Sequence, residues 1–150
     1  MNQKELELYV HIPFCVKKCS YCDFLSAPAT EQTKEAYMAA LFAEIGGRAK
    51  DYKDRIVTSV FIGGGTPSLL SGDSIRQLME HIREGFSLAP DAEITMEVNP
   101  GTVTTEKLAA FYGAGINRLS IGMQSAQEQE LKILGRIHDF DGFCQVYREA

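Results

Sequence analysis

Three closely spaced cysteines near the start of the chain have the spacing of a metal or redox site. Cys15, Cys19 and Cys22 form the pattern C-x-x-x-C-x-x-C directly after an extended apolar run. A closed structural zinc site needs four ligands, usually in two pairs, so these thiols alone leave it one ligand short. A [4Fe–4S] cluster held by three thiolates keeps one iron open to an outside ligand. The spacing therefore favours a cluster that binds and reduces a small molecule, with a redox thiol set and a partial zinc knuckle as alternatives.

The fourth cysteine, Cys144, lies far from the other three in a segment with helical periodicity. It could complete a zinc site. An isolated cysteine inside a helix is, however, typically a small buried apolar residue, and we expect that role here. Lys17 and Lys18, within the cysteine motif, are expected to be solvated loop charges.

The residues around the three cysteines resemble the signature of the radical S-adenosylmethionine (SAM) enzymes. Tyr21 precedes the last cysteine, and the flanks read His-Ile-Pro-Phe-Cys before the motif and Cys-Asp-Phe at its end. These flanks narrow the resemblance to the family that contains the oxygen-independent coproporphyrinogen III oxidases and the related haem chaperone HemW. In this superfamily the open iron chelates SAM, and one electron cleaves the sulfonium to a 5′-deoxyadenosyl radical. The resemblance implies that Cys15, Cys19 and Cys22 hold a [4Fe–4S] cluster, with Tyr9 and Tyr21 packed around cluster and SAM.

Phe24 departs from the pattern of the oxidases. They carry a further cysteine two residues after the motif, where this chain has Phe24. The resemblance therefore favours a haem chaperone that retains the cluster and SAM site, with oxidative decarboxylation of coproporphyrinogen as the alternative. It also implies haem as a ligand, an electron donor, and a haem-accepting protein that can be membrane-associated.

The order of apolar and amphipathic segments predicts an α/β fold. Apolar runs bounded by turns alternate with segments of helical period, which indicates β/α units and a parallel sheet. Strands are expected over residues 6–12, 57–62, 94–98 and 118–124. Helices are expected from about residue 33 to Gly46-Gly47, around 75–82, from 104 to 113, from a capping box at 125–128, and around 143–147.

Four such units do not close a barrel of eight. The resemblance implies a six-unit core, so we expect residues 1–150 to be the N-terminal four β/α units of a radical SAM partial (β/α)6 TIM-like barrel. The remaining barrel and a C-terminal domain would then be absent from this fragment.

Two of the expected strands alternate between polar and apolar side chains. Glu93, Thr95, Glu97 and Asn99 share one face of the third strand, and Arg118, Ser120, Gly122 and Gln124 share one face of the fourth. Because parallel sheets are normally covered on both sides, these polar faces are expected to line a barrel-like interior that holds a polar ligand. A sheet with one watery face is the alternative. The second strand is expected to be covered on both faces, and Tyr112 is expected to point into the core.

A glycine-rich turn, Gly63-Gly64-Gly65-Thr66-Pro67, follows the second strand. Ligands of parallel α/β folds bind at the carboxyl ends of strands, and glycines let a ligand approach the backbone closely. A plain tight turn is equally compatible with these residues, and the lysine of a phosphate-binding loop is missing. The resemblance implies that Gly64, Gly65 and Thr66 bind SAM.

Glu97 is expected to point its carboxylate into the barrel interior, where an ionised group needs a charged or hydrogen-bonding partner. That partner is either Arg118 on the next strand or a SAM hydroxyl or ammonium, and the resemblance favours SAM. By the same resemblance, Gln124 and Arg136 belong to the SAM-binding chamber. His11 is expected to fix the cysteine loop or to act near the cluster.

Composition and charge limit the classes of function that remain. The chain has 150 residues, 45% of them hydrophobic, and a net charge of −5, which argues against a general nucleic-acid surface. No apolar stretch is long enough to span a membrane, and the N-terminus lacks the layout of a signal peptide. We therefore expect a cytoplasmic protein with reduced thiols. His81 and His138 are expected at the surface.

Overall fold

A parallel sheet organises the chain, in the order β1-β2-β3-β4, in a computed structural model that describes residues 4–150. The strands are β1 Lys4–Ile12, β2 Arg55–Gly64, β3 Leu88–Val98 and β4 Arg118–Ile121. The helices are α1 Glu31–Arg48, α2 Gly72–Gly85, α3 Thr105–Ala114, α4 Glu128–Leu134 and α5 Phe140–Glu149, with short 3-10 turns η1 Ala49–Tyr52, η2 Pro67–Leu69 and η3 Pro100–Thr102.

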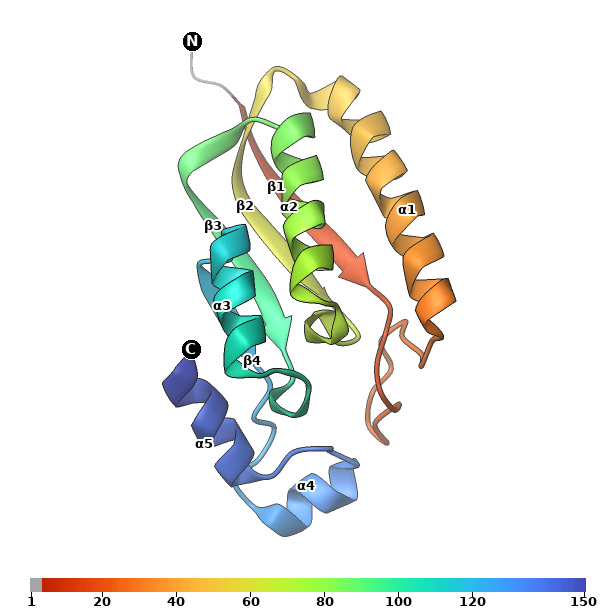
Figure 1. The fold of residues 1–150 in the computed structure, drawn as a ribbon, viewed down its shortest axis with the longest axis vertical. Helices are drawn as coiled ribbons and strands as arrows, with labels where there is room; N and C mark the ends of the chain where they lie inside the picture. The colour runs from red at the N-terminus through yellow and green to blue at the C-terminus, as the bar shows by residue number, and fades with distance from the viewer. Residues whose placement is uncertain (1–3) are drawn as a thin grey trace.

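Helices α1, α2 and α3 cover the same face of the sheet (Figure 1). Their first turns are capped by the hydroxyls of Thr30, Ser71 and Thr104, each of which accepts a backbone N–H three residues on. The core under them comes from alternate strand residues and one stripe of each helix: Val10, Ile12, Val60, Ile62, Met96, Ile75, Leu78, Met79, Ile82 and Phe111. The expected alternation on β3 and β4 is confirmed by their burial patterns, as is the partial-barrel arrangement of β/α units.

The second strand is covered on one face only, which makes the expectation of two covered faces wrong. The β1–β2 and β2–β3 registers both shift at Thr58, a bulge that leaves Val57 and Val60 buried on the same side. Phe61 points to the opposite face and stacks on Tyr9, with ring centroids 6.2 Å apart. Tyr9 is 61% exposed. This open face is the side that would form the interior of a barrel.

Several predicted boundaries are corrected. Helix α1 passes through Gly46 and Gly47, because nothing lies within 4 Å of a side chain at either position and a helical glycine weakens a helix without ending it. Tyr112 is 79% exposed while Phe111 is buried. Successive helical residues point about 100° apart, so both cannot face the sheet.

The end of the fourth unit also differs from the prediction. Strand β4 stops at Ile121, and Gln124 turns the chain with φ of 64°. Helix α4 begins at Glu128, so Ser125 does not cap it. The Ser125 hydroxyl instead accepts the Gln127 N–H and bonds to Glu130. Cys144 lies in α5, as predicted, but is only partly buried. No helix among residues 4–150 combines the length and apolar character needed to cross a bilayer.

Candidate functional site

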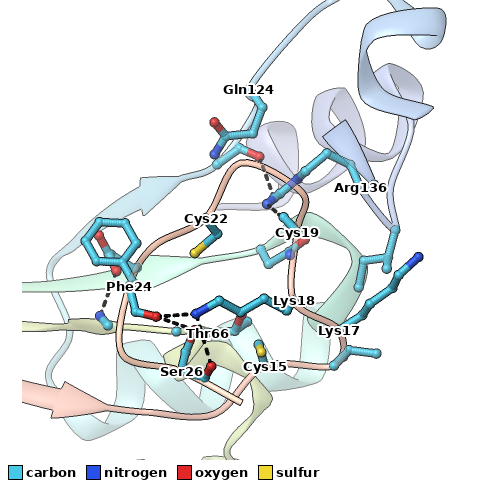
Figure 2. A pocket seen from close by; sticks show the side chains of 18 of the residues that line it. Cys15, Lys17, Lys18, Cys19, Cys22, Phe24, Ser26, Thr66, Gln124 and Arg136 are labelled. Atoms are coloured by element: carbon cyan, nitrogen blue, oxygen red, sulfur yellow. Dashed lines mark hydrogen bonds between the residues drawn. The ribbon is translucent and has the colours of Figure 1, made fainter. Parts of the chain in front are cut away.

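A cavity of about 260 Å³ lies at the carboxyl ends of the strands, where five segments meet. The cysteine loop forms one side, and the Gly64–Pro67 turn and the end of β3 form the other. The strand β4 with the turn after it, and residues 135–137 after α4, close it (Figure 2). Every predicted site residue lines this cavity except Tyr9, which stands on the open face of the sheet beside it.

The cysteine loop is closed at its base by backbone hydrogen bonds. The Cys15 N–H donates to Ala27 O at 3.2 Å, and the Ala27 N–H donates to Pro13 O at 3.0 Å. Lys18 crosses the loop and donates to the carbonyls of Phe24 and Ser26, as Figure 2 shows. Lys18 is exposed, as expected of a loop charge, and its two hydrogen bonds also brace the loop. Lys17 lines the cavity.

The three loop thiols are free, partly buried and open to the same cavity. Among residues 4–150, no three His, Cys, Asp or Glu side chains are grouped to hold a single metal ion. A tetrahedral zinc site brings thiolate sulfurs to about 3.8 Å from one another, given Zn–S bonds of about 2.3 Å. A cluster does not require that grouping, because each thiolate binds a different iron.

His11 connects the cysteine loop to the sheet. Its Nε2 lies 2.9 Å from Leu25 O, and its Nδ1 lies 2.9 Å from Tyr9 Oη. A carbonyl oxygen can only accept, so Nε2 carries the proton and Nδ1 accepts from the Tyr9 hydroxyl. His11 thus has the loop-fixing role considered from the sequence, and it connects Tyr9 to the cavity indirectly.

The glycine-rich turn presents its backbone to the cavity. Gly64 has φ of 121°, and its N–H donates to Glu97 Oε2 at 3.0 Å. The Gly65 N–H donates to Ile12 O at 2.9 Å, and a Cβ at this position would lie 2.5 Å from Phe14 O. Thr66 is buried beside them. The turn therefore needs glycine for close packing against the base of the cysteine loop.

Glu97 does not pair with Arg118, so that expected structural partner is wrong. Arg118 is level with Thr95 in the β3–β4 register, whereas Glu97 is level with Ser120. Arg118 instead lies 3.2 Å from Glu93 Oε1. One Glu97 oxygen accepts the Gly64 N–H. Burial, and then the Glu97 carboxylate, raise the pKa of Tyr9.

Arg136 reaches into the cavity from the segment after α4. Its Nη1 lies 3.9 Å from Cys19 Sγ and 3.4 Å from Tyr21 Oη, and its Nη2 donates to Gly122 O at 3.2 Å (Figure 2). Its Nε is buried without a partner. Arg136 thus brings a positive charge to one of the three loop thiols.

His138 is buried, which makes its predicted surface position wrong. It is 9% exposed; its Nε2 lies 3.3 Å from Met123 O, and its Nδ1 is buried without a partner. Burial, and then Arg136, lower the pKa of this imidazole. His81 is half-exposed on α2 and stacks on Phe42 at 4.3 Å. His138 and Arg136 thus hold the carbonyls of Met123 and Gly122, the two residues before Gln124.

Residues 9–150 match the model of the radical SAM superfamily. This chain belongs to that superfamily. It is 49% identical over 134 residues to the haem chaperone HemW of Escherichia coli, covering 89% of this chain and 35% of the relative. It is 41% identical over 143 residues to the mitochondrial radical S-adenosyl methionine domain-containing protein 1 of Bos taurus, covering 95% of this chain and 32% of the relative.

Among solved structures, the radical SAM enzyme coproporphyrinogen III oxidase (HemN) of Escherichia coli matches with a TM-score of 0.91 and 35% identity. The match covers 99% of this chain and 34% of the oxidase. The chain therefore spans about a third of the length of the relatives it matches. These matches agree with the fold and family predicted from the cysteine motif.

Radical SAM proteins use a [4Fe–4S] cluster and SAM, and the residues around this cavity fit both groups. Three thiols with a guanidinium against one of them suit iron. The turn backbone, the Thr66 hydroxyl, the Glu97 carboxylate and the Gln124 amide also line the cavity, and such hydrogen-bonding groups suit the amino, carboxylate and ribose groups of SAM. The polar strand faces predicted Asn99, Ser120 and Gly122 as lining residues, and all three line the cavity. The sequence did not single out Gly135 or Ile137, which flank Arg136.

Proposed function

We propose that this chain forms the cofactor-binding part of a HemW-like haem chaperone, which binds haem and delivers it to target proteins. One observation carries the proposal: the cysteine motif, the glycine turn, Glu97, Gln124 and Arg136 converge on one cavity. The similarity to HemW supports the chaperone function, as does Phe24, which replaces the further cysteine of the oxidases.

Within this proposal, Cys15, Cys19 and Cys22 would hold the cluster, and the Arg136 guanidinium lies against Cys19. The bound cluster supplies an electron and an open coordination position. Gly64, Gly65 and Thr66 approach SAM through their backbone and hydroxyl, while Glu97 accepts hydrogen bonds from its donors. Gln124 can donate and accept. Tyr21 packs over the cluster, and Tyr9 orients His11, which ties down the loop.

The wider context belongs to the same proposal. The chain is the N-terminal part of a core whose other strands and C-terminal domain lie outside these residues. Haem is a ligand of the whole protein, which works in the cytoplasm with an electron donor and a haem-accepting protein that can be membrane-associated. The similarity to HemW relatives supports the haem and its acceptor.

The first test is anaerobic reconstitution of the full-length protein with iron and sulfide, followed by EPR of the reduced cluster with and without SAM. We expect a cluster signal that shifts on adding SAM, and loss of the signal in Cys19→Ala. Cys144→Ala is the matched control and should keep the signal, because Cys144 does not line the cavity. A cluster indifferent to SAM, or zinc in place of iron and sulfide, would contradict the cofactor assignment.

Haem transfer then separates a chaperone from an enzyme. The protein is loaded with haem and mixed with an acceptor apoprotein, and porphyrinogen products are measured in parallel. Haem transfer without decarboxylation supports the chaperone. A decarboxylated porphyrinogen formed together with 5′-deoxyadenosine would overturn it in favour of the oxidase.

A further inference from the structure

Two hydroxyls, one buried and one partly buried, meet behind the cavity, where the glycine-rich turn and the end of β3 come together. Ser68 lies in η2, just after the turn, and is 0% exposed. Thr102 ends η3, just after β3. Their hydroxyl oxygens are 2.6 Å apart. Neither residue lines the cavity, although Thr66 and Asn99, close to them in sequence, do.

The hydrogen bonds of this pair close into a ring whose direction is fixed. The Asn99 N–H donates to Ser68 Oγ at 3.0 Å, and the Thr102 hydroxyl donates to Asn99 O at 2.8 Å. Thr102 has a single hydroxyl proton, which that bond uses, so the Ser68 hydroxyl must donate to Thr102 Oγ1. The chain of hydrogen bonds therefore runs from the Asn99 N–H through the two hydroxyls to the Asn99 carbonyl. Removing either hydroxyl opens it.

Lys107, near the start of α3, reinforces the ring from outside. Its ammonium donates to Ser68 O at 2.6 Å and to Thr102 O at 2.9 Å. The side chain is half-buried and packs over the Phe111 ring at 5.8 Å. One lysine thus bridges the backbones of both 3-10 turns.

The ring lies where regular strand pairing between the two walls has ended. The β2–β3 register runs up to Ile62 and Met96. Past those residues the walls are joined by the bond from Gly64 to Glu97, by the ring and by Lys107. The ring is thus placed to fix how far the Gly64–Pro67 wall stands from Glu97 and Asn99.

We propose that Ser68 and Thr102 are positioning residues that set the separation of the two cavity walls for SAM. The inference rests on the proposed SAM site. The two side chains act through Thr66, Glu97 and Asn99, without contact to the ligand. They are expected to change SAM affinity while leaving the cluster in place.

The test uses Thr102→Val in the full-length reconstituted protein, because valine keeps the shape of threonine and loses the hydroxyl. We expect the Kd for SAM to rise on the order of tenfold, which corresponds to about 1.4 kcal/mol. Iron content and the EPR signal without SAM should equal those of the wild type. Thr102→Ser keeps the hydroxyl and should restore the affinity. Ser68→Ala should behave like Thr102→Val.

A matched control separates positioning from stability. Ile82→Val shortens a core side chain in α2, away from the cavity, and should lower the Tm without changing the Kd. The inference is overturned if Thr102→Val binds SAM as the wild type does, or if Ile82→Val weakens SAM binding equally. A wild-type protein whose cluster does not respond to SAM would instead refute the proposed cofactor site.

Discussion

The glycine-rich wall and the cysteine loop face each other across one cavity but are held by different means. The wall continues β2, is buried, and is joined to β3 through Gly64–Glu97 and the ring of Ser68 and Thr102. The loop has no regular structure beyond its base, and Phe24 is 66% exposed. Its interior is held by Lys18, by Ser20 against Ile133 O, and by His11.

The difference shows which part of the site is built before any ligand binds. The wall is joined to β3 by hydrogen bonds within the protein, so its geometry is fixed before a ligand binds. The loop places its thiols on one side of the cavity without regular structure, so we expect a ligand bound to the thiols to add to its order. Substitutions in the wall should therefore cost stability, and substitutions in the loop should cost local order.

The largest effect is expected from Gly65→Ala, which pushes the wall against the loop. The new Cβ would lie 2.5 Å from Phe14 O and 2.8 Å from Ser26 Cβ, so backbone must move. We expect the free energy of unfolding to fall by about 2–3 kcal/mol, as for overpacked sites, measured by denaturant unfolding of the full-length protein.

Gly47→Ala is the matched control for that substitution. Gly47 lies inside α1 with nothing within 4 Å of the added Cβ. It should raise the free energy of unfolding by about 0.5–1 kcal/mol. Equal stability of Gly65→Ala and the wild type would show that the wall is not rigid.

A smaller and local effect is expected from His11→Leu, which frees the loop from the sheet. The substitution removes the hydrogen bonds to Leu25 O and the Tyr9 hydroxyl, which are exposed to water, so the net cost is about 0.5–1.5 kcal/mol. Hydrogen–deuterium exchange should accelerate in residues 15–27 and stay unchanged in residues 63–68. His81→Leu, on the half-exposed face of α2, should leave both segments unchanged. Acceleration in both segments of His11→Leu would mean that wall and loop form one unit.

The smallest effect concerns pH and the turn that carries Gln124. The pKa of His138 lies below its ordinary value of about 6.5, because of burial and Arg136; the hydrogen bond to Met123 O, and then Asp139 and Glu128, oppose them more weakly. The unfolded chain then binds more protons than the folded chain as the pH falls below about 6.5. As the pH falls from that value through the folded-state pKa of His138, the residue progressively lowers the free energy of unfolding. Above that pH, His138 has no such effect.

His138→Gln keeps a donor for Met123 O and cannot titrate in this range, so it should flatten the dependence of Tm on pH between about 5 and 7. His81→Gln should leave the slope as in the wild type. An unchanged slope in His138→Gln would show that the imidazole does not govern it.

The sequence predicted those features of the fold that follow from a repeating pattern of side chains. It failed for features that depend on a single contact. Alternation placed Glu97 on the polar face of β3, and helical spacing placed a helix around residues 75–82; both are confirmed. The predicted ends of strands and helices differ from the observed ends, because the ends depend on local hydrogen-bond and packing partners. Gly46-Gly47 is a stop signal in isolation, yet it lies in open space on α1, where nothing prevents the helix from continuing.

For the site, the motif order identified the residues that meet, since the strand ends of a parallel sheet share one edge. The motif order could not identify the hydrogen-bond and ion-pair partners of these residues. The registers that put Arg118 level with Thr95, and the burial of His138 against Met123 O, depend on contacts between distant segments. The roles of Ser68 and Thr102 were hidden for the same reason, because an isolated serine or threonine carries no spacing signal.

The strands lie in the sheet in the order in which they occur in the chain. This order affects when the parts of the domain form during synthesis. Each strand pairs with the one made just before it, so the domain can assemble as it leaves the ribosome. The cysteine loop emerges first, whereas Arg136, which lies against Cys19, follows 117 residues later. At about 5–20 residues per second, the thiols wait roughly 6–23 s for that cover. The thiols are therefore made well before the guanidinium that lies against one of them, and the cavity is complete only once Arg136 has been translated.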